Sequence, residues 1–239
     1  MSVSNKKNCI NNSALLISAI KKGDMNMVQT LIDNRVNVNK DINGNLPLHT
    51  SIWQGHLEIV RLLIKKVANL DKANMYDLTP LQIASNLGNL EIVRLLVDAG
   101  ADIDQANEKG GTPLSRACQN GHLEIVRLLI EEGADMDTWD SEDYDTPLTR
   151  ASLEGHLEIV RLLVENGANL NEVNLNDNMT PLICASREGH LEVVRLLVDA
   201  GADLNKVNEN GDTALDIAKE MGHLEIVRLL VDAGADKGE

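Results

Sequence analysis

Aromatic residues are almost missing from this chain. Among its 239 residues there is no phenylalanine, and aromatic side chains make up 2% of the total, against 43% for hydrophobic residues as a whole. Without large rings, the interior has to be filled by Leu, Ile, Val and Ala packed in thin layers. We therefore expect many small interfaces in place of one large core.

Positive charge is scarce as well. Lys and Arg number 22 against 37 Asp and Glu, a formal net charge of −15, and the charge is unevenly spread, since residues 1–45 have six basic and three acidic residues. A surface this acidic repels phosphate backbones, and no basic stripe with interleaved aromatics offsets it. Nucleic acid is therefore not an expected partner.

Cysteines and long apolar runs are few. Cys9, Cys118 and Cys184 are odd in number and lack the spacing of a disulfide framework or a zinc site, which favours free thiols in a reducing compartment. No apolar run approaches membrane-spanning length, and residues 1–13 hold no apolar signal segment. We expect an intracellular, cytoplasmic protein with no membrane partner.

What the chain does have is a repeat, the string Gly-His-Leu-Glu-Ile-Val-Arg-Leu-Leu. Exact copies of this string occupy residues 55–63, 121–129, 155–163 and 222–230. Two further copies carry a single change each, at Asn89 and Val193. Successive first glycines are 33 or 34 residues apart, a period typical of stacked repeats. Because stacked units bury their mutual contacts and leave an extended face open, function is expected on a surface.

The unit that begins at Thr112 predicts a short first helix. Thr is a preferred N-cap residue, and Pro113 at the first helical position loses no useful hydrogen-bond donor. All five prolines of the chain occupy this position. Leu114, Ala117 and Cys118 follow at the spacing of one buried helical face, with small residues where neighbouring helices approach.

A turn and a second, more apolar helix follow in the same unit. Gly121 breaks the chain, the apolar pattern from Leu123 to Leu129 predicts an amphipathic helix, and Gly133 ends it in the left-handed conformation. Residues 134–145 are polar and rich in Asp, so they predict a protruding hairpin-like loop, called a finger from here on. The unit is therefore helix, turn, helix, finger.

These motifs resemble the ankyrin repeat. Thr-Pro-Leu, then Ala, then Gly-His-Leu-Glu-Ile-Val and Gly-Ala-Asp follow one another in that family's order across residues 14–239. The resemblance implies an all-α repeat solenoid, a single domain of helix-turn-helix units joined by β-hairpin-like fingers. The seven expected units are residues 14–45, 46–78, 79–111, 112–145, 146–179, 180–212 and 213–239. Residues 1–13, polar and without periodicity, are expected to be a disordered or irregular N-terminal tail.

Departures from the family's pattern predict a weaker beginning of the stack. Arg35 and Val67 stand where later units have the helix-ending glycine, and a left-handed conformation costs such residues about 1–2 kcal/mol. The family's opening tetrapeptide ends in a His that hydrogen-bonds between units, and only His49 keeps it. We expect the first two units to open first.

A positive φ is also expected two residues before the N-cap residue of each first helix. The positions are Gly44, Asp77, Gly110, Tyr144, Asn178 and Gly211. Tyr tolerates this geometry poorly, so the finger around Tyr144 is expected to be reshaped. The second helix of the last unit repeats the interior string unchanged where a cap would be more polar, which predicts an exposed apolar end.

Residues with catalytic or metal-binding potential are dispersed. Five of the six histidines recur once per unit in the same turn, separated by whole layers, so a structural role is favoured over a metal site. The acidic finger from Asp135 to Asp145 lacks the loop order of a calcium site, which favours solvated charge. Cys118 is expected in the core and Cys184 on the opposite, partly exposed face. No enzymatic activity, cofactor or metal is expected.

Variation between units indicates the binding surface. Second helices are nearly identical, whereas fingers and the outer face of the first helices vary, which is what recognition on a rigid frame needs. The candidate partner-binding residues on the first helices are Trp53, Ile83, Leu87, Arg116, Gln119, Arg150, Leu153 and Arg187. Those on the acidic finger are Trp139, Asp140, Asp143 and Tyr144. Local packing is the alternative role of each.

A non-catalytic protein-protein interaction module is the expected function, with the partner on the concave face of fingers and first helices. The acidic surface favours a partner with a basic surface. The alternative is an engineered or consensus-derived scaffold without a natural partner. Identical nonapeptides favour design or recent duplication, whereas the irregular first units and the three cysteines favour a natural origin. We expect a monomer, with self-association confined to the uncapped C-terminal unit.

Overall fold

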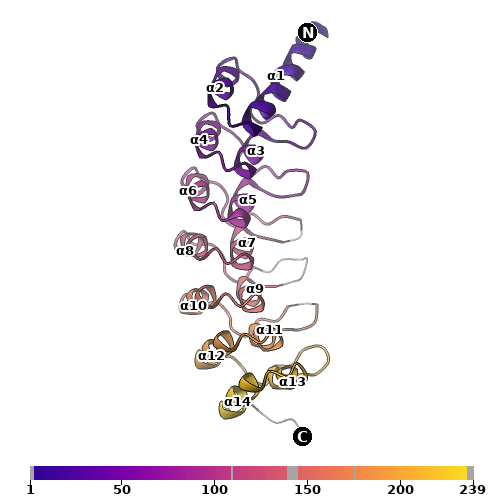
Figure 1. The fold of residues 1–239 in the computed structure, drawn as a ribbon, viewed down its shortest axis with the longest axis vertical. Helices are drawn as coiled ribbons and strands as arrows, with labels where there is room; N and C mark the ends of the chain where they lie inside the picture. The colour runs from indigo at the N-terminus through magenta and orange to yellow at the C-terminus, as the bar shows by residue number, and fades with distance from the viewer. Residues whose placement is uncertain (1–2, 109, 139–144, 175, 236–239) are drawn as a thin grey trace. The chain divides into compact units, whose positions relative to one another are not determined.

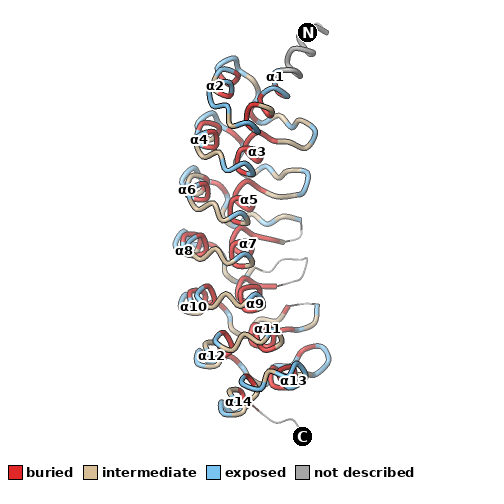
Figure 2. Tube along the Cα trace, viewed as in Figure 1, coloured by how far each residue is buried: buried red, intermediate tan, exposed pale blue. Residues whose placement is uncertain are grey.

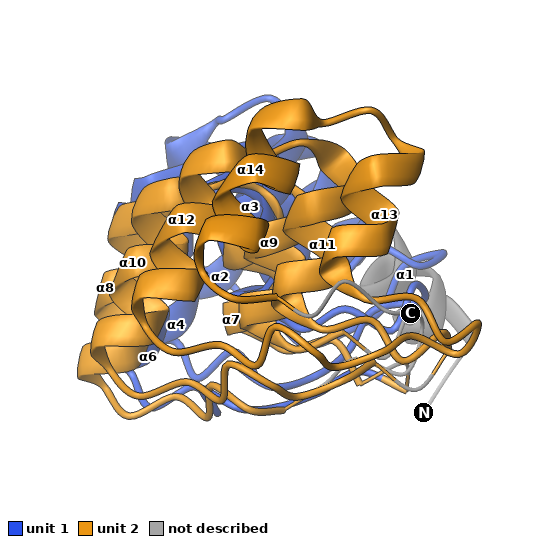
Figure 3. Cartoon of the chain, turned by 90° about the horizontal axis from the view of Figure 1, so that it is seen from below, with its two compact units in different colours: residues 1–107 blue, residues 108–239 orange. Residues whose placement is uncertain are grey.

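The computed structural model describes residues 3–108, 110–138, 145–174 and 176–235, with side chains from residue 12 onward. The chain divides into two compact units, Met1–Asn107 (unit 1) and Glu108–Glu239 (unit 2), which Figure 3 draws in different colours. In the described residues of both units the secondary structure is helical, apart from isolated β-bridges at Ile42–Asn45 and Val207–Thr213 in the fingers. The expected all-α repeat fold is confirmed.

In the part of unit 1 that the structure describes there are three helix pairs. Its helices are α1 (Val3–Lys21), α2 (Met25–Asp33), α3 (Pro47–Trp53), α4 (Leu57–Lys65), α5 (Pro80–Leu87) and α6 (Leu90–Asp98). The prediction of an irregular tail over residues 1–13 is wrong for the part that the structure describes, because α1 already begins at Val3. Without proline or glycine before Gly23, nothing in this segment breaks a helix.

The described residues of unit 2 form four helix pairs. Its helices are α7 (Pro113–Gln119), α8 (Leu123–Glu131), α9 (Pro147–Leu153), α10 (Leu157–Glu165), α11 (Pro181–Glu188), α12 (Leu191–Asp199), α13 (Ala214–Glu220) and α14 (Leu224–Asp232). Within each unit the first helices of the pairs form one row and the second helices another, and the fingers project from the first-helix side (Figure 1). Successive helices of a row contact each other within the unit.

Threonine caps fix where the first helices begin. At α5, Thr79 Oγ1 accepts a hydrogen bond from the Gln82 backbone N–H at 3.2 Å, while Gln82 Oε1 accepts one from the Thr79 N–H at 2.9 Å. Two otherwise unsatisfied donors of the first turn are thus paired. Later first helices have the same Thr cap, whereas Leu46 before α3 offers no side-chain acceptor.

The second helices are amphipathic, and α10 is representative. Ile159, Val160 and Leu163 are buried, while Glu158 and Arg161 form an exposed pair at 3.6 Å. Exposed pairs of this kind contribute little stability, so burial of the apolar stripe holds the helix in place. Figure 2 shows the consequence, with the first-helix row largely buried and the second helices exposed on one side.

Left-handed residues end the helices and turn the fingers where the sequence predicts them. Arg35 and Val67 both have φ of 60°, in the position that glycine holds in later repeats. The predicted finger positions also have positive φ at Gly44, Asp77, Gly110, Asn178 and Gly211. The remaining one, Tyr144, lies outside the described residues.

Candidate protein-binding surface

The candidate surface is the inner face, defined as the fingers and the exposed ends of the first helices. Trp53 at the end of α3 and Leu87 at the end of α5 are exposed, as predicted. Arg116, Gln119, Leu153 and Arg187 are partly exposed at the matching part of α7, α9 and α11. These residues lie on the inner face within their own units.

Three residues predicted to be exposed are buried instead. Ile83, Arg150 and Cys184 occupy the same position in α5, α9 and α11, one turn after the helix start, and each is buried. The spacing of Leu114, Ala117 and Cys118 indicates one buried stripe, but α9 and α11 each contact a first helix on both sides within the row. Ile217 holds the same position in α13, which contacts a first helix on one side only, and is buried as well, so the buried stripe of the first helices is wider than predicted.

Arg150 forms a buried ion pair that the sequence did not indicate. Its Nη2 lies 3.3 Å from Asp145 Oδ2, with both side chains less than one tenth exposed, and Asn174 Nδ2 donates to Asp145 Oδ1 at 3.1 Å. Asn174 Oδ1 in turn accepts from the Met179 N–H at 2.9 Å. Burying a charge is tolerated only with such partners, so Arg150 and Asp145 join two neighbouring repeats and are not free to bind a partner protein.

The finger before α5 carries exposed residues that the sequence patterns did not single out. Met75 and Tyr76 are 65% and 69% exposed. Asn74 Oδ1 accepts from the Tyr76 N–H at 2.8 Å and from the Leu78 N–H at 3.1 Å, and Asp77 is left-handed, so the tip of this finger is held by its own turn. Because aromatics are so rare in this chain, a Met-Tyr pair in a polar loop was the sequence feature that could have indicated these exposed residues.

The other predicted finger residues belong to the acidic finger. Trp139, Asp140, Asp143 and Tyr144 lie outside the residues that the structure describes. Their part in binding stays a prediction.

Asp and Asn side chains of the fingers bind backbone N–H groups. Asp135 Oδ1 accepts from the Asp137 N–H at 2.9 Å within one finger, and Asp137 Oδ1 accepts from the Asn169 N–H at 3.2 Å in the next. In the same way, Asn171 Oδ1 accepts from the Asp203 N–H at 2.8 Å. In unit 1, Asn39 Oδ1 accepts from the Asn69 N–H, and Asp71 Oδ1 accepts from the Asp102 N–H. The prediction that the acidic finger is solvated charge is therefore incomplete, because carboxylate and amide oxygens of this kind link each finger to the next.

Three of the repeated histidines link the start of a second helix to the first helix of the preceding repeat. Nε2 of His156, His190 and His223 donates to the carbonyl oxygens of Gln119, Leu153 and Arg187 at 3.2, 2.9 and 3.1 Å, at the end of the preceding first helix. Each ring also lies against the glycine that follows that helix. The predicted structural role of these histidines agrees with this geometry.

The two cysteines that the structure describes are buried thiols. Cys118 and Cys184 are free and buried, and burial raises the pKa of both thiols, which removes the nucleophilic thiolate. The predicted partial exposure of Cys184 is wrong, because this residue shares the covered position of Arg150. Within the described residues, no group of three or more His, Cys, Asp or Glu side chains could hold a metal ion.

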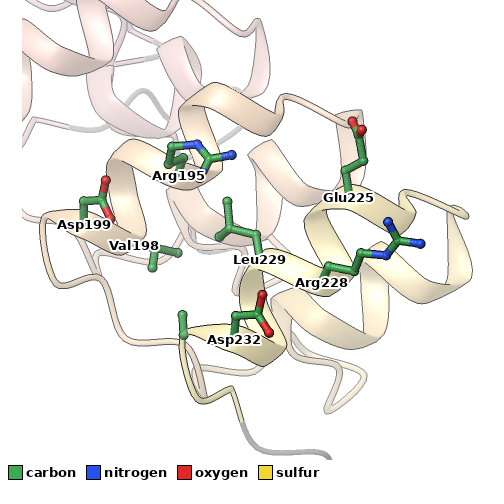
Figure 4. A pocket seen from close by; sticks show the side chains of 8 residues that line it. Arg195, Val198, Asp199, Glu225, Arg228, Leu229 and Asp232 are labelled. Atoms are coloured by element: carbon green, nitrogen blue, oxygen red, sulfur yellow. The ribbon is translucent and has the colours of Figure 1, made fainter.

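A shallow groove lies between α12 and α14 on the second-helix side (Figure 4). Its volume is about 360 Å³, and Val198, Leu229 and Ala233 supply its apolar part. The charged residues around it are Arg195, Asp199, Glu225, Arg228 and Asp232. Charges of both signs alternate there, which is not the convergent donor set of a cofactor site. None of the helices in the described part is long and apolar enough to cross a membrane.

Charge is divided unequally between the units. Unit 1 has 11 basic and 10 acidic residues, whereas unit 2 has 11 basic and 27 acidic residues. The negative charge of the chain therefore belongs to unit 2, and the exposed Trp53, Met75, Tyr76 and Leu87 belong to unit 1.

Paired helices, left-handed turns and finger-to-finger hydrogen bonds define a repeat protein of the helix-turn-helix solenoid class. The family model of ankyrin repeats matches residues 2–74, 65–140, 81–174, 132–208 and 170–239, and the chain belongs to the ankyrin repeat family. Proteins of this family are typically non-enzymatic modules that bind other proteins.

Curated relatives resemble part of the chain. The Notch-regulated ankyrin repeat-containing proteins of Homo sapiens and Xenopus tropicalis are each 35% identical over 72 residues, which is 28% of this chain and 63% of the relative. The Notch-regulated ankyrin repeat-containing protein A of Danio rerio matches with the same identity, over 64% of its length. The chain therefore spans less than two thirds of these relatives, and the similarity identifies the repeat without identifying a partner.

Proposed function

We propose that this chain is a non-catalytic protein-binding module whose partner contacts the inner face. The observation that carries the proposal is the exposure of Trp53, Met75, Tyr76 and Leu87 on that side of unit 1. Aromatic residues and methionine are enriched where proteins bind each other, and these are presented on helices and a finger that the fold holds in place.

The charge of unit 2 supports a partner with a basic surface. Its surplus of acidic residues attracts cationic proteins and repels nucleic acid. Within this part of the proposal, Trp139 and Tyr144 are further contact residues, as are Gln119, Leu153 and Arg187 of the first helices. Free buried thiols support a reducing intracellular compartment, the cytoplasm in the simplest case.

Affinity capture followed by direct binding measurement tests the proposal. The full chain and its Trp53→Ala and Trp139→Ala variants are used as bait in a cell lysate, and proteins retained by the wild type alone are identified, purified and titrated by calorimetry. Trp53→Ala should lower affinity about 10-fold or more if this side chain is a hot spot, and raising the salt concentration should slow association. Val67→Gly is the matched control, because it removes an exposed apolar side chain at the end of a second helix.

Three results would change the proposed binding site or overturn the proposal. Loss of binding only with Trp139→Ala would move the site to unit 2. Unchanged binding in both variants would overturn the inner-face proposal. Reproducible capture of nothing would favour the alternative, an engineered or consensus-derived scaffold without a natural partner.

A further inference from the structure

The first helix pair leaves open a face that a preceding pair covers elsewhere. In α4, α6, α10 and α14 the third residue is a buried isoleucine, and each of these helices follows another second helix in its unit. Met27 holds that position in α2 and is 38% exposed. Leu15 holds the position of the buried Pro47 and Pro80, and is 43% exposed. We call this face, made of Leu15 and Met27, the head face.

The last helix pair leaves open the opposite kind of face. The first residue of the second helices is half-buried from Leu57 to Leu191, but Leu224 in α14 is 66% exposed. The fourth residue of the second helices is fully buried in α4, as Val60, and in α12, as Val194. In α14 the fourth residue, Val227, is only half-buried. We call this face, made of Leu224 and Val227, the tail face. Leu224 also borders an open groove of about 210 Å³ together with Leu191 and Ile226.

The first helix of the last pair is polar where the second is apolar. Lys219 occupies the position that Ser152 and Ser186 fill in the buried interior, and its Nζ lies 3.3 Å from Asp216 Oδ1, with both side chains partly exposed. The apolar opening thus lies mainly at α14, although Met221 at the end of α13 is exposed as well. The expected exposed apolar end is present there and has a definite composition.

The two ends of the sequence are opposite in charge, and the head and tail faces are complementary in repeat position. Residues 1–45 contain six basic and three acidic residues, and residues 213–239 contain three basic and six acidic residues. Met27 has the position through which later pairs pack on their predecessor, and Leu224 and Val227 have the positions through which earlier pairs pack on their successor. A tail-to-tail contact would instead bring two acidic surfaces together.

We propose that the tail face binds the head face of a second copy of this chain. In this contact the α1–α2 pair of one copy follows the α13–α14 pair of the other, as α13–α14 follows α11–α12 within unit 2. The contact is heterologous, so a dimer retains one free head and one free tail and association continues with concentration. It uses faces separate from the inner face, so its success or failure is independent of the protein-binding proposal.

Two charge-introducing variants test the proposal. Leu224→Asp blocks the tail face and Met27→Asp blocks the head face, and each places a carboxylate in the first turn of its helix, where the helix dipole tolerates it. Circular dichroism and thermal unfolding check that both variants fold. Masses are then measured by sedimentation equilibrium over a range of concentrations.

The wild type should rise above the monomer mass of 26.1 kDa with concentration, and each variant alone should stay monomeric. An equimolar mixture of the two variants should form dimers that grow no further, because only one intact head and one intact tail remain per pair. High salt should weaken the association. Leu87→Asp, an acidic substitution on the inner face, should associate as the wild type does.

Three outcomes would overturn the proposal. A wild type that stays monomeric at every concentration excludes the contact. Association retained by Met27→Asp and lost by Leu224→Asp shows tail-to-tail pairing. Failure of the mixture to dimerise shows that the two faces do not bind each other.

Discussion

His49 couples the stability of unit 1 to pH. Its ring is buried, Nε2 donates to the Leu78 carbonyl oxygen at 3.1 Å, and burial lowers its pKa from 6.5 to about 4. The unfolded chain therefore binds this proton more readily than the folded chain does. Stability is fully present above pH 6.5 and is lost as the pH falls from 6.5 toward 4. A shift of this size corresponds to about 3 kcal/mol.

The prediction is that His49→Gln removes most of this pH dependence. Urea unfolding at pH 7 and pH 5 should show the wild type losing more stability than the variant, because only the wild type has the buried ring of His49. Equal losses in the two proteins would mean that His49 is protonated in the folded state.

Val67 is strained by its backbone. It has φ of 60° and its side chain is 82% exposed, so little packing offsets the conformation. Val67→Gly should raise the free energy of unfolding by about 1 kcal/mol, although the greater freedom of glycine in the unfolded chain offsets part of the gain. Gly100→Val is the reverse control, because φ is 85° there and an added Cβ meets no atom within 4 Å. Chemical denaturation should show opposite signs for the two variants.

At the scale of the element, neighbouring repeats interlock through a histidine and a glycine. A Cβ added to Gly155 would lie 2.6 Å from the His190 ring, whereas one added to Gly55 would meet nothing within 4 Å. The difference arises because Asn89 replaces histidine in the repeat that follows Gly55. The two glycines have φ of 74° and 69°, so backbone strain is common to both.

Gly155→Ala should therefore destabilise the protein more than Gly55→Ala, by about 1–3 kcal/mol for the overpacking alone. Thermal and urea unfolding of the two variants measure the difference. Equal losses of stability in the two variants would mean that the His190 ring moves away from the added methyl group without a cost in free energy.

The Asp145–Arg150 pair gives a second test of how elements join. Arg150→Ile alone leaves a buried carboxylate and should cost about 3–5 kcal/mol. Unit 1 has Leu78 and Ile83 at the same two positions, so the double variant Asp145→Leu/Arg150→Ile reproduces a pair that this fold already accommodates. The double variant should lose less stability than the single one. Additive losses in a double-mutant cycle would show that the two side chains are not coupled.

At the scale of the whole molecule, stability should be graded along the chain. Contacts in a repeat protein are mainly between neighbours, so repeats can open separately. In the first two, Arg35 and Val67 are left-handed, Leu46 provides no side-chain cap, and His56 Nε2 has no hydrogen-bond partner. Hydrogen exchange should be faster in α2–α4 than in α9–α12. Equal protection of the two regions would contradict this gradient.

The class of fold and most of its local geometry follow from the amino-acid sequence alone. A 33-residue period, prolines at helix starts and glycines at helix ends specify helix pairs and fingers, and Asp77 and Asn178 could be assigned a positive φ. These are properties of short segments, set by caps, turns and a periodic apolar stripe, so they can be predicted without knowledge of what packs against them.

Which side chains of the first helices are free depends instead on how the repeats pack. Ile83, Arg150 and Cys184 are exposed in the prediction and buried in the structure, where Arg150 pairs with Asp145. The links from Asp137 to Asn169 and from His190 to Leu153 join residues more than 30 positions apart. No local pattern records such contacts. They depend on the distance and orientation at which one repeat packs on the next, which the stacked layers set together.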